Sequence, residues 1–133
     1  MRAETRQREF NMKMLIDAVG LKDKTEYVSF SEYHFKKMYL EGTGVLIFDT
    51  INRKVYVNLS PRADKSLLTE FMTKFNEYVK KDPYKEVTFK AFNDKNAIYH
   101  TNVMLGMLTN HVVVALDSIK SKKEREDVVR ELT

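Results

Sequence analysis

Two residues that could carry out acid–base chemistry stand at corresponding places in a repeated pattern. Glu41 precedes two turn glycines and an apolar segment at 45–48, and His100 lies near the head of a second apolar segment at 98–108. Residues at the ends of loops carry chemistry more often than residues in strand middles. A glutamate that accepts a hydrogen bond from an imidazole fixes its tautomer and makes the other ring nitrogen a better base. The sequence therefore predicts a Glu41–His100 acid–base pair, if the two units converge on one axis.

Arg62 is the third candidate, because it follows a proline in a polar loop and could present its fork of N–H donors to a substrate carboxylate. Each candidate also has a purely structural interpretation. His100 could be a hydrogen-bonded core histidine, Glu41 a solvated residue beside turn glycines, and Arg62 a surface residue paired with Asp64. The residue types alone leave both interpretations open.

The elements that must position these side chains are predicted from hydrophobic periodicity and capping signals. Gly20 is expected to end the first helix in the left-handed conformation, Asp64 to cap a helix through Val79, and Ser121 with Glu124 to form a capping box. The pattern of strand, hairpin, strand and helix occurs twice, at a period of roughly 50 residues, which favours a propeller-like or stacked α/β arrangement. The expected segments are helices over 2–19, 65–79 and 122–132, strands over 27–30, 45–48, 54–59, 87–92 and 112–116 (the last one buried), and turns at 93–96 and 109–110.

Length and composition set the class of protein. The 133 residues are 43% hydrophobic, enough for one domain of ordinary size, and show no shift in composition that would mark a second. The net charge of +4 comes from interspersed charges rather than from basic clusters, so no nucleic-acid partner is predicted. The sequence has neither an apolar run of membrane-spanning length nor a leader pattern, and we expect no membrane association and a cytoplasmic location. Cysteine is absent, which excludes disulfides and thiolate sites within these residues.

Three ordered motifs resemble those of a known enzyme family. The segments 40–44 (LEGTG), 58–64 (NLSPRAD) and 98–104 (IYHTNVM) occur in the order and at the intervals seen in guanidine-modifying enzymes. These enzymes include arginine deiminases, dimethylarginine dimethylaminohydrolases and glycine amidinotransferases. The chain is most similar to the bacterial-type branch labelled amidinotransferase or arginine-deiminase-related, and the resemblance covers nearly all of it.

This resemblance implies a pentein fold, an α/β propeller of five ββαβ units around a pseudo-fivefold axis. The chain would then be a single partial pentein domain over 1–133, lacking the first and last units and holding roughly two to two and a half of the five. Within it, 1–20 would be an N-terminal helix, 40–92 the first full unit and 97–133 the second unit.

The resemblance also implies roles for four residues. His100 would be the general acid/base, Glu41 its acidic partner and a contact of the substrate guanidinium, and Arg62 a contact of the substrate α-carboxylate. Asn102 falls where several family members carry an aspartate that holds the guanidinium, so a neutral amide there leaves the identity of the substrate open. In the family a cysteine thiolate attacks the guanidinium carbon, and neither a metal nor an organic cofactor is needed.

The chain departs from the family pattern in having no cysteine nucleophile, so it is expected to be inactive by itself. It could be the central part of an enzyme that cleaves a C–N bond of an arginine-like guanidino substrate, by hydrolysis or by amidino transfer. Alternatively, it could be a non-catalytic module that binds a guanidino ligand or a protein, or a structural α/β module with coincidental motifs. Because a partial ring would leave strand edges and an apolar face uncovered, we also predict a homo-oligomer.

Overall fold

A computed structural model of the protein describes residues 12–24 and 26–133. The chain divides into two compact units, Met1–Lys37 and Met38–Thr133, and each is described here by itself. The single domain predicted over 1–133 stays a prediction. No helix among the described residues is long and apolar enough to cross a membrane.

The described residues of the first unit form three short helices. They are α1 (Met12–Ala18) and the 3-10 helices η2 (Lys22–Lys24) and η3 (Ser31–His34). Gly20 ends α1 with φ of 68°, and the Leu21 amide donates to the Ile16 carbonyl at 3.0 Å. This bond from the residue after the left-handed glycine is typical of a Schellman C-cap, so the predicted helix end is confirmed. The start of the predicted helix, residues 2–11, lies outside the described residues.

The strand predicted over Tyr27–Phe30 is wrong. Residues 26–30 have no regular secondary structure, and no strand occurs among the described residues of the first unit. A strand is stable only when its backbone N–H and C=O groups pair with a neighbour, and alternating side chains alone do not supply one.

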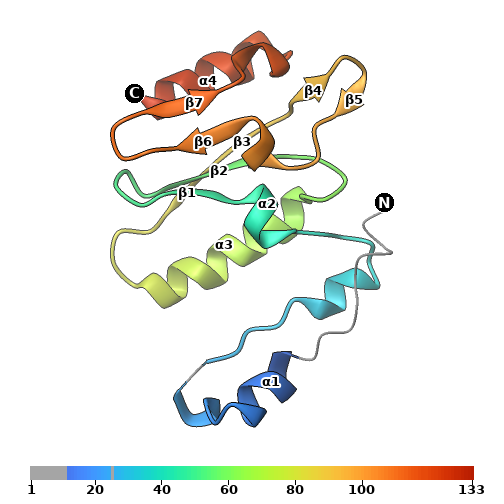
Figure 1. The fold of residues 1–133 in the computed structure, drawn as a ribbon, viewed down its shortest axis with the longest axis vertical. Helices are drawn as coiled ribbons and strands as arrows, with labels where there is room; N and C mark the ends of the chain where they lie inside the picture. The colour runs from blue at the N-terminus through green and yellow to red at the C-terminus, as the bar shows by residue number, and fades with distance from the viewer. Residues whose placement is uncertain (1–11, 25) are drawn as a thin grey trace. The chain divides into compact units, whose positions relative to one another are not determined.

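The second unit is built around a three-stranded sheet in the order β1-β2-β3. The strands are β1 (Ile47–Asp49), β2 (Lys54–Asn58) and β3 (Lys85–Phe89), and helix α3 (Lys65–Val79) connects the last two. Strand β1 pairs antiparallel with β2, whereas β3 pairs parallel with β2, which requires the crossover that α3 provides. The element order is therefore ββαβ (Figure 1).

Asp64 caps α3 as predicted, because its carboxylate accepts hydrogen bonds from the amides of Ser66 and Leu67. The strand predicted over 45–48 begins later than expected. A short helix, α2 (Gly42–Val45), comes first, and β1 starts only at Ile47. The Val45 carbonyl accepts a hydrogen bond from the Thr101 hydroxyl at 2.6 Å, so this tertiary contact satisfies a group that a strand would have paired.

The remaining residues form two small antiparallel sheets and a last helix. The predicted turns at 93–96 and 109–110 lie within these two hairpins, and the strand predicted over 87–92 is in fact β3, ending at Phe89, followed by the first short hairpin. The elements are β4 (Phe92–Asn93), β5 (Asn96–Ala97), η4 (Thr101–Val103), β6 (Leu105–Met107), β7 (Val112–Val114), η5 (Leu116–Ser118) and α4 (Lys122–Leu132).

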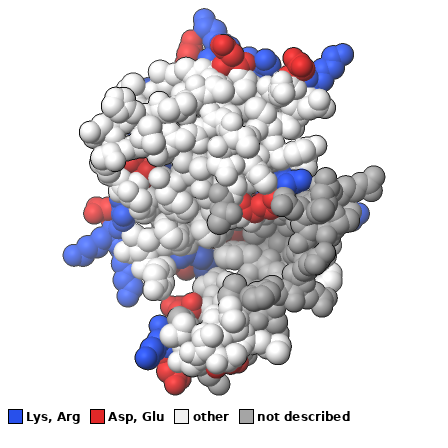
Figure 2. Space-filling model, viewed as in Figure 1, with Lys and Arg blue, Asp and Glu red and all other residues white. Residues whose placement is uncertain are grey.

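Strand β7 is less buried than the sequence predicts, because Val113 is 65% exposed and the strand ends at Val114. A two-stranded sheet can turn only one face to the core, so alternate residues of β7 meet solvent. Figure 2 shows positive and negative side chains along α4, while the area over β6 and β7 carries almost no charge.

The capping box of α4 forms only in part. The Ser121 hydroxyl accepts from the Glu124 amide, but the Glu124 carboxylate accepts from the Lys90 amide instead of returning to Ser121.

The core lies on both faces of β2, because successive side chains of a strand point to opposite sides. Val55 and Val57 pack toward α3, whereas Tyr56 packs toward α4 and β6. All three are fully buried. The described residues form a mixed α/β structure with small sheets, as predicted, and these sheets do not close into a propeller.

Candidate active site

Three predicted site residues meet in the second unit. Glu41 Oε2 lies 2.6 Å from His100 Nε2, and Arg62 Nη1 lies 3.4 Å from each of these two atoms. The Glu41 and His100 side chains are each 25% exposed and that of Arg62 is 10% exposed, so solvent screens the cluster only partly. The geometry places a carboxylate between an imidazole and a guanidinium.

The hydrogen-bond roles follow from the chemistry of the groups. An ionised carboxylate can only accept, so His100 Nε2 must donate to Glu41. Arg62 Nη1 is also a donor, and its approach to Nε2 is therefore a contact between two donors, while its hydrogen bond goes to Glu41. This assignment leaves His100 Nδ1 as the nitrogen that can take up a proton.

Glu41 and His100 occupy corresponding local positions. Glu41 is the residue before α2 and His100 the residue before η4, and neither side chain caps the helix that follows it. The two helices are in contact, and the polar ends of the two side chains meet. The convergence expected from the repeated pattern thus occurs, with short helices in place of the expected strand entrances. This contact does not test the catalytic roles, which stay predictions.

Gly44 makes room for the imidazole. A Cβ atom at this position would lie 2.9 Å from His100 Cγ and 3.0 Å from His100 Nδ1, closer than real Cβ contacts allow. Neither Gly44 nor Gly42 has a positive φ, so the expected tight turn is not the reason for glycine here. Gly44 is needed because the ring packs directly against its backbone.

Backbone pairing holds Glu41 and Arg62 together. The Glu41 amide donates to the Arg62 carbonyl at 3.1 Å, and Leu40 and Ala63 form a β-bridge next to this bond. The Val45 amide donates back to the Glu41 carbonyl at 3.1 Å and closes the turn of α2. The relative position of the two charged side chains is therefore set by the main chain as well as by their own ion pair.

The Arg62 side chain packs against an aromatic ring. Its guanidinium carbon lies 4.9 Å from the centre of the Tyr99 ring, within the range of a cation–π interaction. Ser60 links the two loops, because its hydroxyl donates to the Tyr99 carbonyl at 2.7 Å and accepts from the Arg62 amide. Arg62 is buried, and the Asp64 carboxylate accepts a hydrogen bond from the Ser66 amide at the start of α3. The interpretation of Arg62 as a surface residue paired with Asp64 therefore does not fit the structure.

Asn102 lies on η4 with an exposed side chain. Within residues 26–133, no hydrogen bond joins its amide to Glu41, Arg62 or His100. The structure therefore brings together three of the four predicted site residues and leaves the fourth beside them on the surface. Among the described residues there is also no group of three or more His, Asp or Glu side chains placed to hold a metal ion.

Sequence reasoning missed four residues that shape this site: Gly44 in its true role, Asn58, Tyr99 and Thr101. All four lie inside the three quoted motifs. The available signal was the presence of polar residues in otherwise apolar segments, since a buried polar side chain is retained only with partners. Asn58 and Thr101 are both fully buried and hydrogen-bonded.

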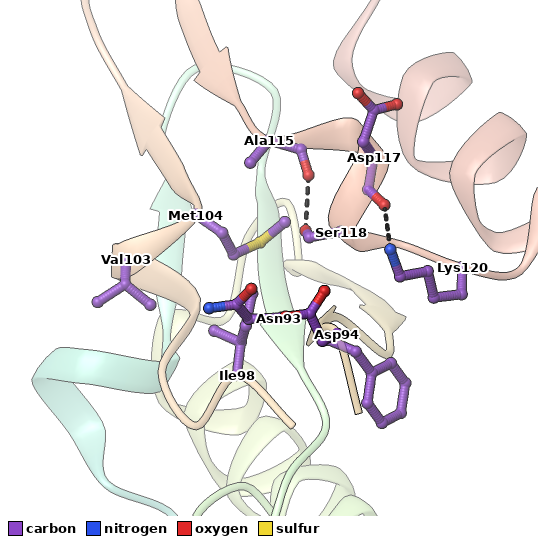
Figure 3. Close-up of a pocket in the computed structure, with 10 residues that line it drawn as sticks. Asn93, Asp94, Ile98, Val103, Met104, Ala115, Asp117, Ser118 and Lys120 are labelled. Atoms are coloured by element: carbon purple, nitrogen blue, oxygen red, sulfur yellow. Dashed lines mark hydrogen bonds between the residues drawn. The ribbon is translucent and has the colours of Figure 1, made fainter. Parts of the chain in front are cut away.

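A separate hollow of about 450 Å³ opens beside η4 and η5 (Figure 3). Its wall mixes apolar and polar side chains, and Glu41, Arg62 and His100 do not line it. In Figure 3 the Ser118 hydroxyl is bonded to the Ala115 carbonyl, and the Lys120 amine to the Asp117 carbonyl. The lining residues are Phe92, Asn93, Asp94, Ile98, Val103, Met104, Ala115, Asp117, Ser118 and Lys120.

Comparison with known protein families gives a match over the whole of the given chain. The model of the family described as "N,N dimethylarginine dimethylhydrolase, eukaryotic" matches residues 1–133, the whole of the given chain. No curated protein and no solved structure matches the chain.

Proposed function

Because this chain belongs to the eukaryotic N,N-dimethylarginine dimethylhydrolase family, we propose that Glu41, Arg62 and His100 form the guanidino-binding, acid–base part of a site that hydrolyses methylated arginine. Members of the family hydrolyse methylated arginines by cleaving the guanidino group. The match to a hydrolase family supports hydrolysis over the amidino transfer that the sequence left open.

The observation that carries this proposal is the guanidinium already present at the site. The Glu41 carboxylate accepts from a guanidinium N–H of Arg62 at 3.4 Å and from His100 Nε2 at 2.6 Å. A carboxylate facing a guanidinium is the pairing that a methylated arginine would require. We propose that the substrate guanidinium takes the place that the Arg62 guanidinium has in this structure.

His100 would supply the proton chemistry. When the C–N bond of a tetrahedral adduct breaks, the departing methylamine or dimethylamine must gain a proton, and an imidazolium within reach can provide it. The 2.6 Å bond to Glu41 fixes the ring orientation. Water then attacks the carbon of the remaining amidino–thiol adduct and gives its proton to the neutral imidazole. Cleavage of the C–S bond releases the ureido product and the thiolate, which restores the starting state.

Arg62 would bind the α-carboxylate of the amino acid. Its planar donor fork suits a carboxylate, and its loop is anchored by Ser60 rather than by the ion pair alone. Release from Glu41 would let the guanidinium turn to the substrate carboxylate. Asn102, exposed on η4 beside His100, would remain a neutral polar contact for the substrate.

These 133 residues contain no cysteine, so they do not supply the thiolate that the resemblance implies as the nucleophile. A thiolate that attacks the guanidinium carbon would form a C–S bond, and expulsion of the amine would leave an amidino–thiol adduct. The non-catalytic alternative, a module that only binds a guanidino ligand, predicts the same contacts but no turnover when a thiol nucleophile is supplied.

The element order supports the pentein interpretation. β1-β2-α3-β3 is one ββαβ unit, and β6-β7-α4 repeats its first three elements. We propose that these are consecutive units of such a propeller. The uncharged surface over β6 and β7, with Leu108 and Val113 exposed, is consistent with a homo-oligomer, and light scattering over a wide concentration range tests it.

Isothermal calorimetry tests the proposed function on the 133-residue chain. We expect asymmetric dimethylarginine to bind and Glu41→Gln to weaken it about tenfold or more, since a charge-assisted hydrogen bond contributes about 1.5–3 kcal/mol. Glu77→Gln is the matched control, because Glu77 is an exposed residue of α3 whose side chain is paired with Lys74. Equal affinity of Glu41→Gln and the unchanged chain would refute the site.

A further inference from the structure

A single hydroxyl group joins the three segments that carry the site residues. Thr101 is fully buried, and its Oγ1 donates to the Val45 carbonyl at 2.6 Å and accepts from the Asn58 amide at 2.8 Å. A hydroxyl has one donor and two acceptor sites, so these two bonds use it in both directions. The three bonded residues lie far apart in the sequence.

Each bonded residue is close in the chain to one of the site residues. Thr101 follows His100 directly. Val45 belongs to α2, whose turn is closed by the bond from its own amide to the Glu41 carbonyl. Asn58 is the last residue of β2, immediately before the loop that carries Arg62. Any displacement of the Thr101 hydroxyl therefore moves the imidazole relative to the carboxylate.

The Asn58 side chain reinforces this junction from the other side. Its Nδ2 donates to the Ile98 carbonyl at 2.6 Å, and its Oδ1 accepts from the Ala91 amide at 2.8 Å. Asn58 thus fixes the backbone two residues before His100, while Thr101 fixes it one residue after. Because both side chains are fully buried and hydrogen-bonded, water cannot replace these contacts without opening the core.

The packing of the ring leaves little tolerance for movement. His100 lies against Gly44 so closely that even a Cβ atom would not fit between them. The hydrogen bond from Nε2 to Glu41 is 2.6 Å long and weakens steeply when its geometry changes. A shift of a few tenths of an ångström at Thr101 would either press the ring onto Gly44 or lengthen this bond.

We propose that Thr101, supported by Asn58, is a positioning residue that sets the His100 imidazole against Glu41 and so selects the tautomer with the proton on Nε2. Thr101 does not touch the substrate in this account and acts only through the histidine. The importance of this tautomer for hydrolysis rests on the proposed function, but its selection by Thr101 does not.

Nuclear magnetic resonance of the His100 ring nitrogens tests the proposal on the full 133-residue chain. In the unchanged protein, at a pH at which the NMR spectrum shows a neutral ring, we expect separate Nε2 and Nδ1 resonances, typical of a single tautomer. Thr101→Val removes the hydroxyl and keeps the shape, and we expect the two resonances to move toward an averaged position. Thr101→Ser keeps the hydroxyl and should restore the separation.

Thr101→Ala covers the case in which Thr101→Val does not fold. The smaller side chain leaves room for a water molecule to bond the Val45 carbonyl and the Asn58 amide, but that water would hold the segments less rigidly. We expect the same averaging of the His100 resonances in this variant. Resonances that stay separate in a folded Thr101→Ala or Thr101→Val protein would overturn the proposal.

Two controls separate positioning from general stability. Thr73→Val removes an exposed hydroxyl that bonds the Thr69 carbonyl within α3, and Val128→Ala removes buried volume from α4. We expect both variants to keep the His100 spectrum, although Val128→Ala lowers the melting temperature. Averaging in Val128→Ala as strong as that in Thr101→Val would show that any loss of stability moves the ring, and would also overturn the proposal.

The readouts also distinguish failure of the proposed function. If dimethylarginine does not bind the unchanged chain while Thr101→Val still averages the His100 resonances, the substrate assignment is wrong and the positioning role stands. If dimethylarginine binds, we expect Thr101→Val to lower its affinity about tenfold and Thr101→Ser to restore that affinity, in line with the cost of misplacing a binding group.

Discussion

Two clusters of charged side chains, each with one carboxylate, lie near the two ends of strand β2. They differ in the basic groups that surround the carboxylate. Near the first residue of the strand, the Glu131 carboxylate is paired with Lys85 at 2.6 Å and with Lys54 at 3.3 Å. Beyond the last residue, the Glu41 carboxylate is bonded to His100 at 2.6 Å and Arg62 at 3.4 Å. Both clusters place one acid between two basic groups.

The difference between the partners decides what each cluster can do. The hydrogen bond from Lys85, and then that from Lys54, hold the pKa of Glu131 below its ordinary value, and the Lys54 amine also bonds the Glu131 carbonyl. Ammonium groups stay charged near neutral pH, so this cluster fastens the end of α4 to the sheet and exchanges no proton. The Glu41 cluster contains an imidazole, the side chain that most often serves in general acid–base catalysis. We therefore assign the proposed catalysis to the second cluster.

The largest effect that sharpens this comparison is expected from Arg62. Arg62→Gln should lower the affinity for asymmetric dimethylarginine about ten- to a hundredfold, because one charge-assisted contact to the α-carboxylate is lost. Agmatine, which has a guanidinium but no carboxylate, should lose no affinity. Calorimetry with the two ligands measures both values, and Lys85→Gln in the other cluster serves as the control. Equal weakening of both ligands would assign Arg62 to folding rather than to carboxylate recognition.

Gly44→Ala is expected to have the next largest effect on the Glu41 cluster. The new Cβ must displace the His100 ring, which lengthens its bond to Glu41, and dimethylarginine affinity should fall about tenfold. Gly106→Ala is the matched control, since a Cβ at Gly106 would meet no atom within 4 Å. Unchanged affinity in Gly44→Ala, measured by calorimetry on folded protein, would contradict the role given to the ring position.

In the Glu131 cluster, Tyr56→Phe should affect stability but not binding. The Tyr56 hydroxyl donates to the Glu131 carbonyl at 2.6 Å, and loss of this bond should lower the free energy of unfolding by about 1 kcal/mol. Burial, with the nearby charges of Asp49 and Glu131, raises the pKa of Tyr56 from 10.0 to about 12.

The raised pKa adds a pH dependence to this prediction. Because the native state holds the phenol proton more tightly than the unfolded state, stability from Tyr56 is fully present below pH 10 and is lost as the pH rises through 12. Denaturant unfolding should be measured between pH 10 and pH 12. The free energy of unfolding should fall less over this range in Tyr56→Phe than in the unchanged protein. An identical alkaline slope in both proteins would show that Tyr56 is not the responsible group.

The smallest effect is expected from Glu131→Gln, which should lower the melting temperature at neutral pH and leave dimethylarginine affinity unchanged. The pKa of Glu131 is lowered in the folded state, so its contribution is present above the ordinary value of 4.5 and is lost as the pH falls through the folded value. Thermal unfolding from pH 7 to pH 3 should therefore converge for the two proteins at the acidic end. A constant difference across this range would contradict the assignment.

The parts of the fold that could be predicted from sequence are those with local signals. The Asp64 cap, the helix that follows it and the left-handed Gly20 are fixed by neighbouring residues, and all three agree with the structure. Helix α2 could not be predicted, because the bond between Val45 and Thr101 joins distant parts of the chain. The strand expected over 27–30 is wrong for the related reason that alternation does not supply a pairing partner.

The same distinction applies to the site. Residue types and the repeated pattern were sufficient to choose Glu41, Arg62 and His100, because the chemistry of a carboxylate, a guanidinium or an imidazole follows from the residue type alone. The reason for Gly44 was not visible, since the ring that needs its space comes from a distant segment. Thr101 was missed because a buried hydroxyl acts only through its partners.

The most direct test of the central claim follows the His100 ring nitrogens while asymmetric dimethylarginine is added to the unchanged chain. If Glu41 exchanges the Arg62 guanidinium for that of the ligand, the Nε2 resonance should shift with saturation, whereas citrulline, which has the α-carboxylate but no guanidinium, should move it less. A His100 spectrum unaffected by saturating dimethylarginine, or moved equally by citrulline, would contradict the assignment of this cluster as a guanidino site.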